Sequence, residues 1–169
     1  MKTCVYGLLL FSLIALFSSC SSVSRAPEYT YQKDAVTITL RADPQLNLYQ
    51  GSPHTLVACT YQLRDPNAFN QLVDEKDGLP KLLECGRFDA SVAYAKRLVV
   101  QPGQEMRDSL DRAEGAKYVS VVAGYYNLQK ENAVRLFQIP VGGTLSSKPK
   151  DVNIELYLGP QAIQNLKGK

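Results

Sequence analysis

Six runs of apolar residues with strand-like spacing constrain the fold of this chain more than any other feature. The clearest run, 35–41, alternates apolar and polar residues with the period of two expected for a half-buried strand. The other runs are rich in β-branched and aromatic residues and lie at 56–63, 97–100, 118–126, 133–141 and 152–158. Pro102 and Gly103 follow the third run as a turn.

A stretch between the second and third runs, residues 65–94, lacks the strand pattern and favours short helices. Residues 67–73 follow Pro66 with apolar side chains at helical spacing, and Pro80 occupies the first turn of a second short helix at 79–83. Strands interrupted by one helical insertion predict a mainly β fold, a small antiparallel β-sandwich decorated by helices.

The amino-terminal segment has the composition of an export signal. Lys2 supplies a positive charge, and the uncharged apolar core at 5–17 is shorter than the roughly 20 residues that a membrane span needs. Two small residues then precede Cys20, a pattern that resembles the lipobox of bacterial lipoproteins. We therefore predict that residues 1–19 form a signal peptide and that Cys20 is lipidated.

The alternative for Cys20 is an ordinary signal peptide whose removal leaves a free thiol. Lipidation explains more, because its thioether-linked and amide-linked chains supply the two lipid signals that stable anchoring requires. Ser21 follows Cys20 at the position where an aspartate is the usual signal for retention in the inner membrane, so the outer membrane is favoured. Phe17 departs from the Leu, Val or Ile that is usual three residues before the lipidated cysteine. We expect a lipidated cysteine and flexible tether at 20–30 and a single β-sandwich domain at 31–169.

Charge and cysteine usage exclude several function classes. The formal net charge is +3, and the basic residues are interleaved with acidic ones, which is not the pattern of a nucleic-acid-binding protein. Beyond the leader and Cys20, the cysteines that remain are Cys59 and Cys85, with no Cys-x-x-Cys spacing and no nearby histidine. In an oxidising compartment they favour a disulfide over two buried thiols.

Catalytic and cofactor-binding arrangements are not found in the sequence. His54, the only histidine, lies beside Pro53 at a predicted strand entrance, without recognisable partners for a triad or metal centre. No glycine-rich loop of the kind that holds phosphates occurs. We therefore expect no enzyme activity, cofactor, metal or small-molecule substrate.

The segment 43–53, between the first two predicted strands, is far longer than an ordinary hairpin loop of two to five residues. Leu46, Leu48 and Tyr49 are apolar anchors of the kind that dominate protein interfaces when a rigid scaffold presents them. A second interpretation is that Leu46 and Leu48 extend a strand and enter the core. Both interpretations are open at this point.

Several segments together resemble one family, the outer-membrane lipoprotein of the bacterial type VI secretion system, TssJ. They occur in the family's order and span roughly residues 35–141. They are LNLYQGSPH at 46–54, VACTYQLRD at 57–65, NAF at 67–69, VVQPG at 99–103 and VVAGYY at 121–126.

The resemblance implies a transthyretin-like β-sandwich with a small helical insertion, anchored by its lipid to the periplasmic face of the outer membrane. It also implies a partner, the periplasmic C-terminal domain of the inner-membrane protein TssM, and a role in tying a trans-envelope complex to the outer membrane. The family uses the loop between its first two strands for this contact. Carried over by position, the contact residues here are Leu46, Asn47, Leu48, Tyr49 and Gln50.

Two rival classes remain at this stage. A secretion-system pilotin or an assembly chaperone would share the lipobox and the strands but would bind a different client. A periplasmic hydrolase would need His54 within hydrogen-bond reach of a serine and a carboxylate.

The lipidation hypothesis predicts that Cys20→Ser leaves the β-sandwich folded but releases it from membranes, because the variant has no thiol to carry lipid. Fractionation of envelopes and soluble extract measures this directly, with the wild-type chain as the membrane-bound control. A variant that stays wholly in the membrane fraction would contradict the prediction.

Overall fold

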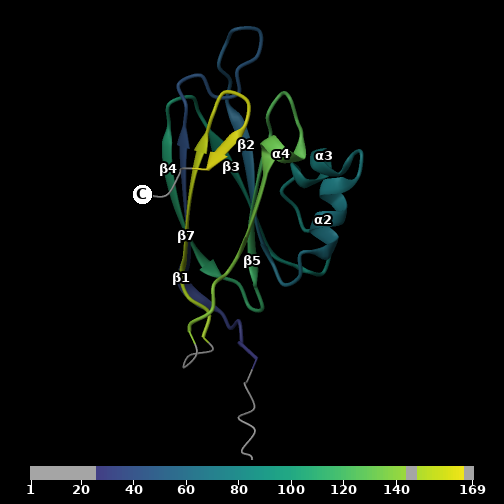
Figure 1. The fold of residues 1–169 in the computed structure, drawn as a ribbon, viewed down its shortest axis with the longest axis vertical. Helices are drawn as coiled ribbons and strands as arrows, with labels where there is room; N and C mark the ends of the chain where they lie inside the picture. The colour runs from purple at the N-terminus through teal and green to yellow at the C-terminus, as the bar shows by residue number, and fades with distance from the viewer. Residues whose placement is uncertain (1–25, 144–147, 166–169) are drawn as a thin grey trace, which may run out of the picture.

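The computed structural model describes residues 26–143 and 148–165, which form two four-stranded sheets packed face to face (Figure 1). The strand orders are β4-β1-β7-β8 in one sheet and β3-β2-β5-β6 in the other. The first sheet contains β1 (Gln32–Ala42), β4 (Glu105–Arg112), β7 (Val152–Leu158) and β8 (Ile163–Asn165). The second contains β2 (Leu56–Leu63), β3 (Val92–Val100), β5 (Tyr118–Ala123) and β6 (Val134–Gln138). The predicted fold class is therefore confirmed.

The predicted helical insertion lies between β2 and β3 and forms two short helices, α2 (Asn67–Asp74) and α3 (Gly78–Leu82). They cover the outer side of the second sheet (Figure 1). Gly78 permits the tight connection, because a Cβ there would lie 1.6 Å from the Leu72 carbonyl oxygen. A third helix, α4 (Lys130–Ala133), precedes β6 and was not predicted. In the part of the chain that the structure describes, no helix has the length and apolar character to cross a membrane.

Two apolar clusters form the core, and β2 contributes to both. Its inward side chains, including Leu56 and Ala58, join Val36, Ile38 and Leu40 of β1 between the sheets. Its outward side chains pack beneath the helices in a second cluster that contains Cys59, Tyr61, Leu63, Phe69, Leu72 and Leu82. Burial on both faces explains why the run at 56–63 is almost continuously apolar rather than alternating.

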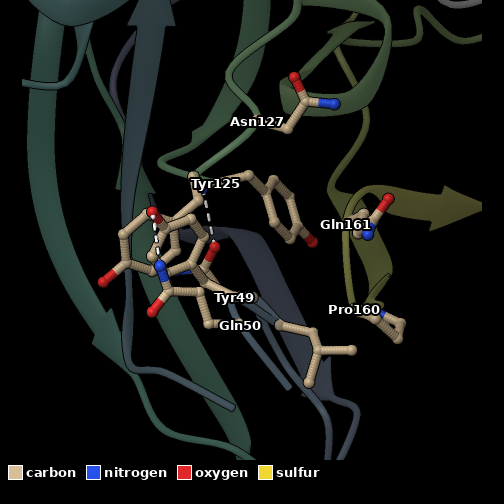
Figure 2. A pocket seen from close by; sticks show the side chains of 9 residues that line it. Tyr49, Gln50, Tyr125, Asn127, Pro160 and Gln161 are labelled. Atoms are coloured by element: carbon tan, nitrogen blue, oxygen red, sulfur yellow. Dashed lines mark hydrogen bonds between the residues drawn. The ribbon is translucent and has the colours of Figure 1, made fainter. Parts of the chain in front are cut away.

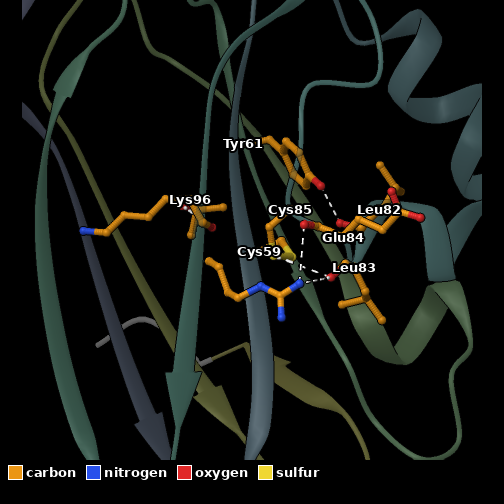
Figure 3. Close-up of a disulfide and its surroundings, with 9 residues drawn as sticks. Cys59, Tyr61, Leu82, Leu83, Glu84, Cys85 and Lys96 are labelled. Carbon is orange, nitrogen blue, oxygen red and sulfur yellow. Dashed lines mark hydrogen bonds between the residues drawn. A yellow bond between two sulfur atoms is a disulfide. The ribbon is translucent and has the colours of Figure 1, made fainter.

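A disulfide joins Cys59 of β2 to Cys85, just after α3, with the two Cα atoms 5.1 Å apart (Figure 3). The compartment argument predicts this bond, and in the fold it ties the helical layer to the sheet. Two hydrogen bonds act beside it, because the Tyr61 hydroxyl donates to the Leu82 carbonyl oxygen and the Arg97 guanidinium donates to the Leu83 carbonyl oxygen.

Strand pairing differs from the prediction in two respects. The sandwich is not wholly antiparallel, because β1 pairs in parallel with β7 while it pairs antiparallel with β4. Neither β4 nor β8 was predicted, and β3 begins at Val92, five residues before the expected start. The β4 sequence is mostly charged, which suits its position at a sheet edge, where charges oppose edge-to-edge aggregation.

The amino-terminal end of the described chain is fixed to the sandwich before β1 begins. Tyr29 is buried in the inter-sheet cluster, and its carbonyl oxygen accepts a 2.7 Å hydrogen bond from the Gly115 amide. Ordered contacts therefore begin inside the segment expected to act as tether, 20–30. The predicted signal peptide at 1–19 and Cys20 lie outside the described residues.

Removing the disulfide through Cys59→Ala with Cys85→Ala is expected to lower the free energy of unfolding by about 3–4 kcal/mol, because the bridge closes a 26-residue separation in the unfolded chain. Urea unfolding under oxidising conditions measures the loss. Wild-type protein unfolded with reductant is the matched control and should approach the variant. Equal stability of oxidised wild type and variant would contradict the expectation.

Candidate interaction surface

The connection between β1 and β2 folds back on itself and ends in a tight turn. The Tyr49 and Ser52 backbones exchange hydrogen bonds of 2.9 and 3.0 Å, with Gln50 and Gly51 between them. Both of these residues have positive φ, 49° and 77°, as the central residues of a type I′ hairpin turn require. The tip of the loop is therefore a defined hairpin.

Leu46 and Asn47 fix the base of this loop. Leu46 is fully buried in the inter-sheet cluster. Asn47 is also buried, and its side chain donates to the Thr55 carbonyl oxygen at 3.3 Å and accepts from the Tyr126 amide at 2.9 Å. Of the two interpretations of the loop, core packing holds for Leu46, whereas Leu48 is only half-buried.

Tyr49 and Gln50 project from the tip, and Tyr49 stacks on another exposed tyrosine. The ring centroids of Tyr49 and Tyr126 lie 4.3 Å apart, with 15° between the ring planes. Tyr49 is 45% exposed and Tyr126 is 55% exposed. The His54 and Tyr126 rings form a T-shaped pair, with their centroids 5.1 Å apart. Gln50 donates a side-chain hydrogen bond of 3.3 Å to the Tyr49 hydroxyl (Figure 2).

Beside the stacked tyrosines is a hollow of about 400 Å³, formed where three segments meet (Figure 2). The segments are 47–50 of the loop, 125–127 after β5 and 160–161 before β8. The Leu48 amide donates to the Pro160 carbonyl oxygen at 2.8 Å, which joins the first segment to the third. The structure thus brings Asn47, Leu48, Tyr49 and Gln50 together with residues that sequence reasoning had not selected.

The sequence analysis missed the other two segments for different reasons. Tyr125 and Tyr126 were counted within the run 118–126, but β5 ends at Ala123, so the tyrosines belong to the loop that follows. Two successive tyrosines at a strand end were the available signal. Pro160 and Gln161 carry no pattern that marks a surface, and only the fold places them here.

The foot of the loop holds a carboxylate with a perturbed pKa. The Tyr157 hydroxyl donates to Asp43 Oδ2 at 2.6 Å, and the Gln45 amide donates to Asp43 Oδ1 at 2.7 Å. Both bonds favour the charged carboxylate, so they hold the pKa of Asp43 below its ordinary value. The same contact raises the pKa of Tyr157. This pairing joins the start of the loop to β7.

His54 lies among aromatic side chains. Its Nδ1 has no hydrogen-bond partner among the described residues, and its ring neighbours are Tyr49 and Tyr126. Within residues 26–143 and 148–165, the His, Cys, Asp and Glu side chains form no group of three that could hold a metal ion.

Residues 34–160 match the family model described as "Type VI secretion lipoprotein, VasD, EvfM, TssJ, VC_A0113". The chain belongs to this type VI secretion lipoprotein family. The matched region begins in β1 and ends at Pro160, so it contains every residue that lines the hollow except Gln161. No curated protein sequence matches the chain.

Solved structures show the same fold. The T6SS lipoprotein TssJ1 from Pseudomonas aeruginosa has a TM-score of 0.59 and 23% identity, over 82% of this chain and 94% of that one. Serratia marcescens Lip, a membrane-bound component of the type VI secretion system, has a TM-score of 0.60 and 18% identity, over 79% and 98%. A chain of the structure described as the TssM C-terminal domain from EAEC gives the same values as Lip.

The Asp43 contact predicts how this lipoprotein responds to acid. A lowered folded-state pKa means that the contribution of Asp43 to stability is present above the ordinary aspartate pKa and is lost as the pH falls through the folded pKa. Tyr157→Phe is expected to raise the pKa of Asp43 towards its ordinary value. Carboxyl NMR titration checks this, and the stability difference between variant and wild type should shrink as pH falls. An unchanged Asp43 pKa would contradict the prediction.

Proposed function

We propose that this lipoprotein binds the periplasmic C-terminal domain of a TssM-like inner-membrane protein and thereby ties the type VI secretion membrane complex to the outer membrane. Membership of the lipoprotein family supports this role over that of a pilotin or chaperone with another client. One chain with this fold also occurs in a structure described as the TssM C-terminal domain. The proposed role is binding rather than catalysis.

The observation that carries the proposal is the exposed hairpin tip at Tyr49 and Gln50. A large aromatic side chain held on a braced loop loses little conformational freedom on binding, which is the property of interface hot spots. We place the partner contact at Leu48, Tyr49 and Gln50, while Leu46 and Asn47 hold this tip in position from within the fold.

The placement of the tip also suits a lipid-anchored protein. The described chain begins at one end of the sandwich, and the β1–β2 loop lies at the other (Figure 1). With lipid on Cys20, the tip would face away from the outer membrane, towards a partner rooted in the inner membrane. The short stretch between Cys20 and the fixed Tyr29 keeps the whole body close to the membrane.

Tyr49→Asp is expected to weaken binding to the TssM-like periplasmic domain by at least about 30-fold, because it removes an aromatic contact and buries a charge. The melting temperature should change little, since the residue is exposed. The measurement is a titration of the mature chain from residue 20, in detergent, against the TssM-like domain encoded in the same cell.

Leu136→Asp is the matched control, because it places the same charge on an exposed apolar position of β6 outside the candidate surface. It should bind like wild type. Wild-type protein that does not bind the domain would refute the proposed function. Equal loss in both variants would refute the placement of the contact.

A further inference from the structure

A buried hydroxyl without a partner lies at the wall of the hollow beside the tyrosine pair. Tyr125 is only 3% exposed, and its hydroxyl makes no hydrogen bond to any described residue. Buried side-chain polar atoms are hydrogen-bonded in the large majority of cases, so an unpaired one requires an explanation. The free protein keeps this group unpaired at a cost in stability, which a bound partner atom would remove.

The hydroxyl is directed at the part of the hollow formed by the turn before β8. Figure 2 shows the Tyr125 ring extending from the loop after β5 towards Pro160 and Gln161, with Asn127 on its other side. A tyrosine hydroxyl keeps its proton at neutral pH in any case, and burial raises the pKa of Tyr125 further. The group is therefore available as a hydrogen-bond donor to an acceptor that enters the hollow.

The other residues of the hollow indicate what kind of acceptor fits. None of the residues that line it carries a formal charge; they are Asn47, Leu48, Tyr49, Gln50, Tyr125, Tyr126, Asn127, Pro160 and Gln161. A charged group would meet no counter-charge among these lining residues and would lose its hydration, which is costly. The charge of Arg135 does act on Tyr125, but the Arg135 guanidinium already donates to the main-chain carbonyl oxygens of Glu131, Val134 and Ile163. Side-chain amides and aromatic rings instead match peptide groups and apolar side chains. Main-chain carbonyl groups are free to accept such a bond where a segment is extended rather than helical.

We propose that the hollow receives an extended, uncharged segment of the TssM-like partner, whose main-chain carbonyl oxygen accepts a hydrogen bond from the Tyr125 hydroxyl. An apolar side chain of that segment lies against the Tyr49–Tyr126 pair. The hydroxyl is shielded from water in the free protein, so the proposal requires a side chain at the rim, such as the exposed Gln161, to move as the carbonyl enters. This inference rests on the proposed function and adds Tyr125 to it as a residue that determines partner specificity.

Tyr125→Phe tests the hydrogen bond because it removes the oxygen and keeps the ring. We expect the variant to bind the TssM-like domain about 2- to 10-fold more weakly than wild type, the range for one neutral hydrogen bond. Its melting temperature should equal or exceed that of wild type, because the free protein loses an unpaired buried group. A fall in melting temperature together with affinity would make Tyr125 a structural residue and overturn the proposal.

Tyr61→Phe is the matched control, because the Tyr61 hydroxyl is buried but already donates to the Leu82 carbonyl oxygen, beneath the helices. We expect it to lower the melting temperature and to leave partner affinity unchanged. The two substitutions delete the same atom from the same residue type, so opposite effects on stability and affinity separate a binding role from a packing role.

Salt dependence gives a second readout. The affinity ratio between wild type and Tyr125→Phe should be the same at about 0.05 and about 0.5 M NaCl, because a bond between neutral groups is not screened. A ratio that falls to one at high salt would overturn the proposal by indicating a charged acceptor.

If wild type binds and Tyr125→Phe binds equally well, this inference alone fails. If wild type does not bind, the proposed function fails with it.

Discussion

Two-sided burial of β2 determines much of the remaining structure, because alternate side chains of this strand enter different apolar clusters. Ala58 lies between the sheets, whereas Tyr61 lies under the helices. A shift of one residue in register would exchange these faces and carry Cys59 away from Cys85. Pairing with β3 on one edge and β5 on the other fixes the register through both backbone ladders. The helical layer, the disulfide and the start of β2 are thereby fixed together.

The exposed loop gains its order from the same packing. It leaves β1 and returns to β2 at Leu56, while Leu46 enters the inter-sheet cluster midway. Asn47 then links the loop to the segment after β5, so movement of either requires breaking a buried amide contact. A surface held in this way loses little conformational entropy when a partner binds, and more of the contact energy remains as affinity. The aromatic rings at the tip are therefore suited to recognition.

The sequence predicted those strands whose side-chain pattern is regular, either alternating or continuously apolar. Alternation identified 35–41, and the apolar run identified β2, although the run alone did not show that a helical layer covered it. The sequence pattern did not predict β4, because the charged residues of this edge strand obscure the alternation of its inward positions. The parallel pairing of β1 with β7 leaves no trace in periodicity. The strand topology brings residues 125–127 and 160–161 to the surface, and a local sequence pattern does not encode that topology.

The path of β1 explains how such a small body could sustain tension between its two ends. This strand starts close to the fixed residue Tyr29, runs the length of the sandwich and delivers the chain to the candidate surface (Figure 1). It is the inner strand between β4 and β7, so it is hydrogen-bonded along both edges. In the proposed complex, any tension between lipid and partner would act on opposite ends of β1. The load is then shared in shear across both ladders, many bonds resisting together, whereas an edge strand would have only one ladder to resist it.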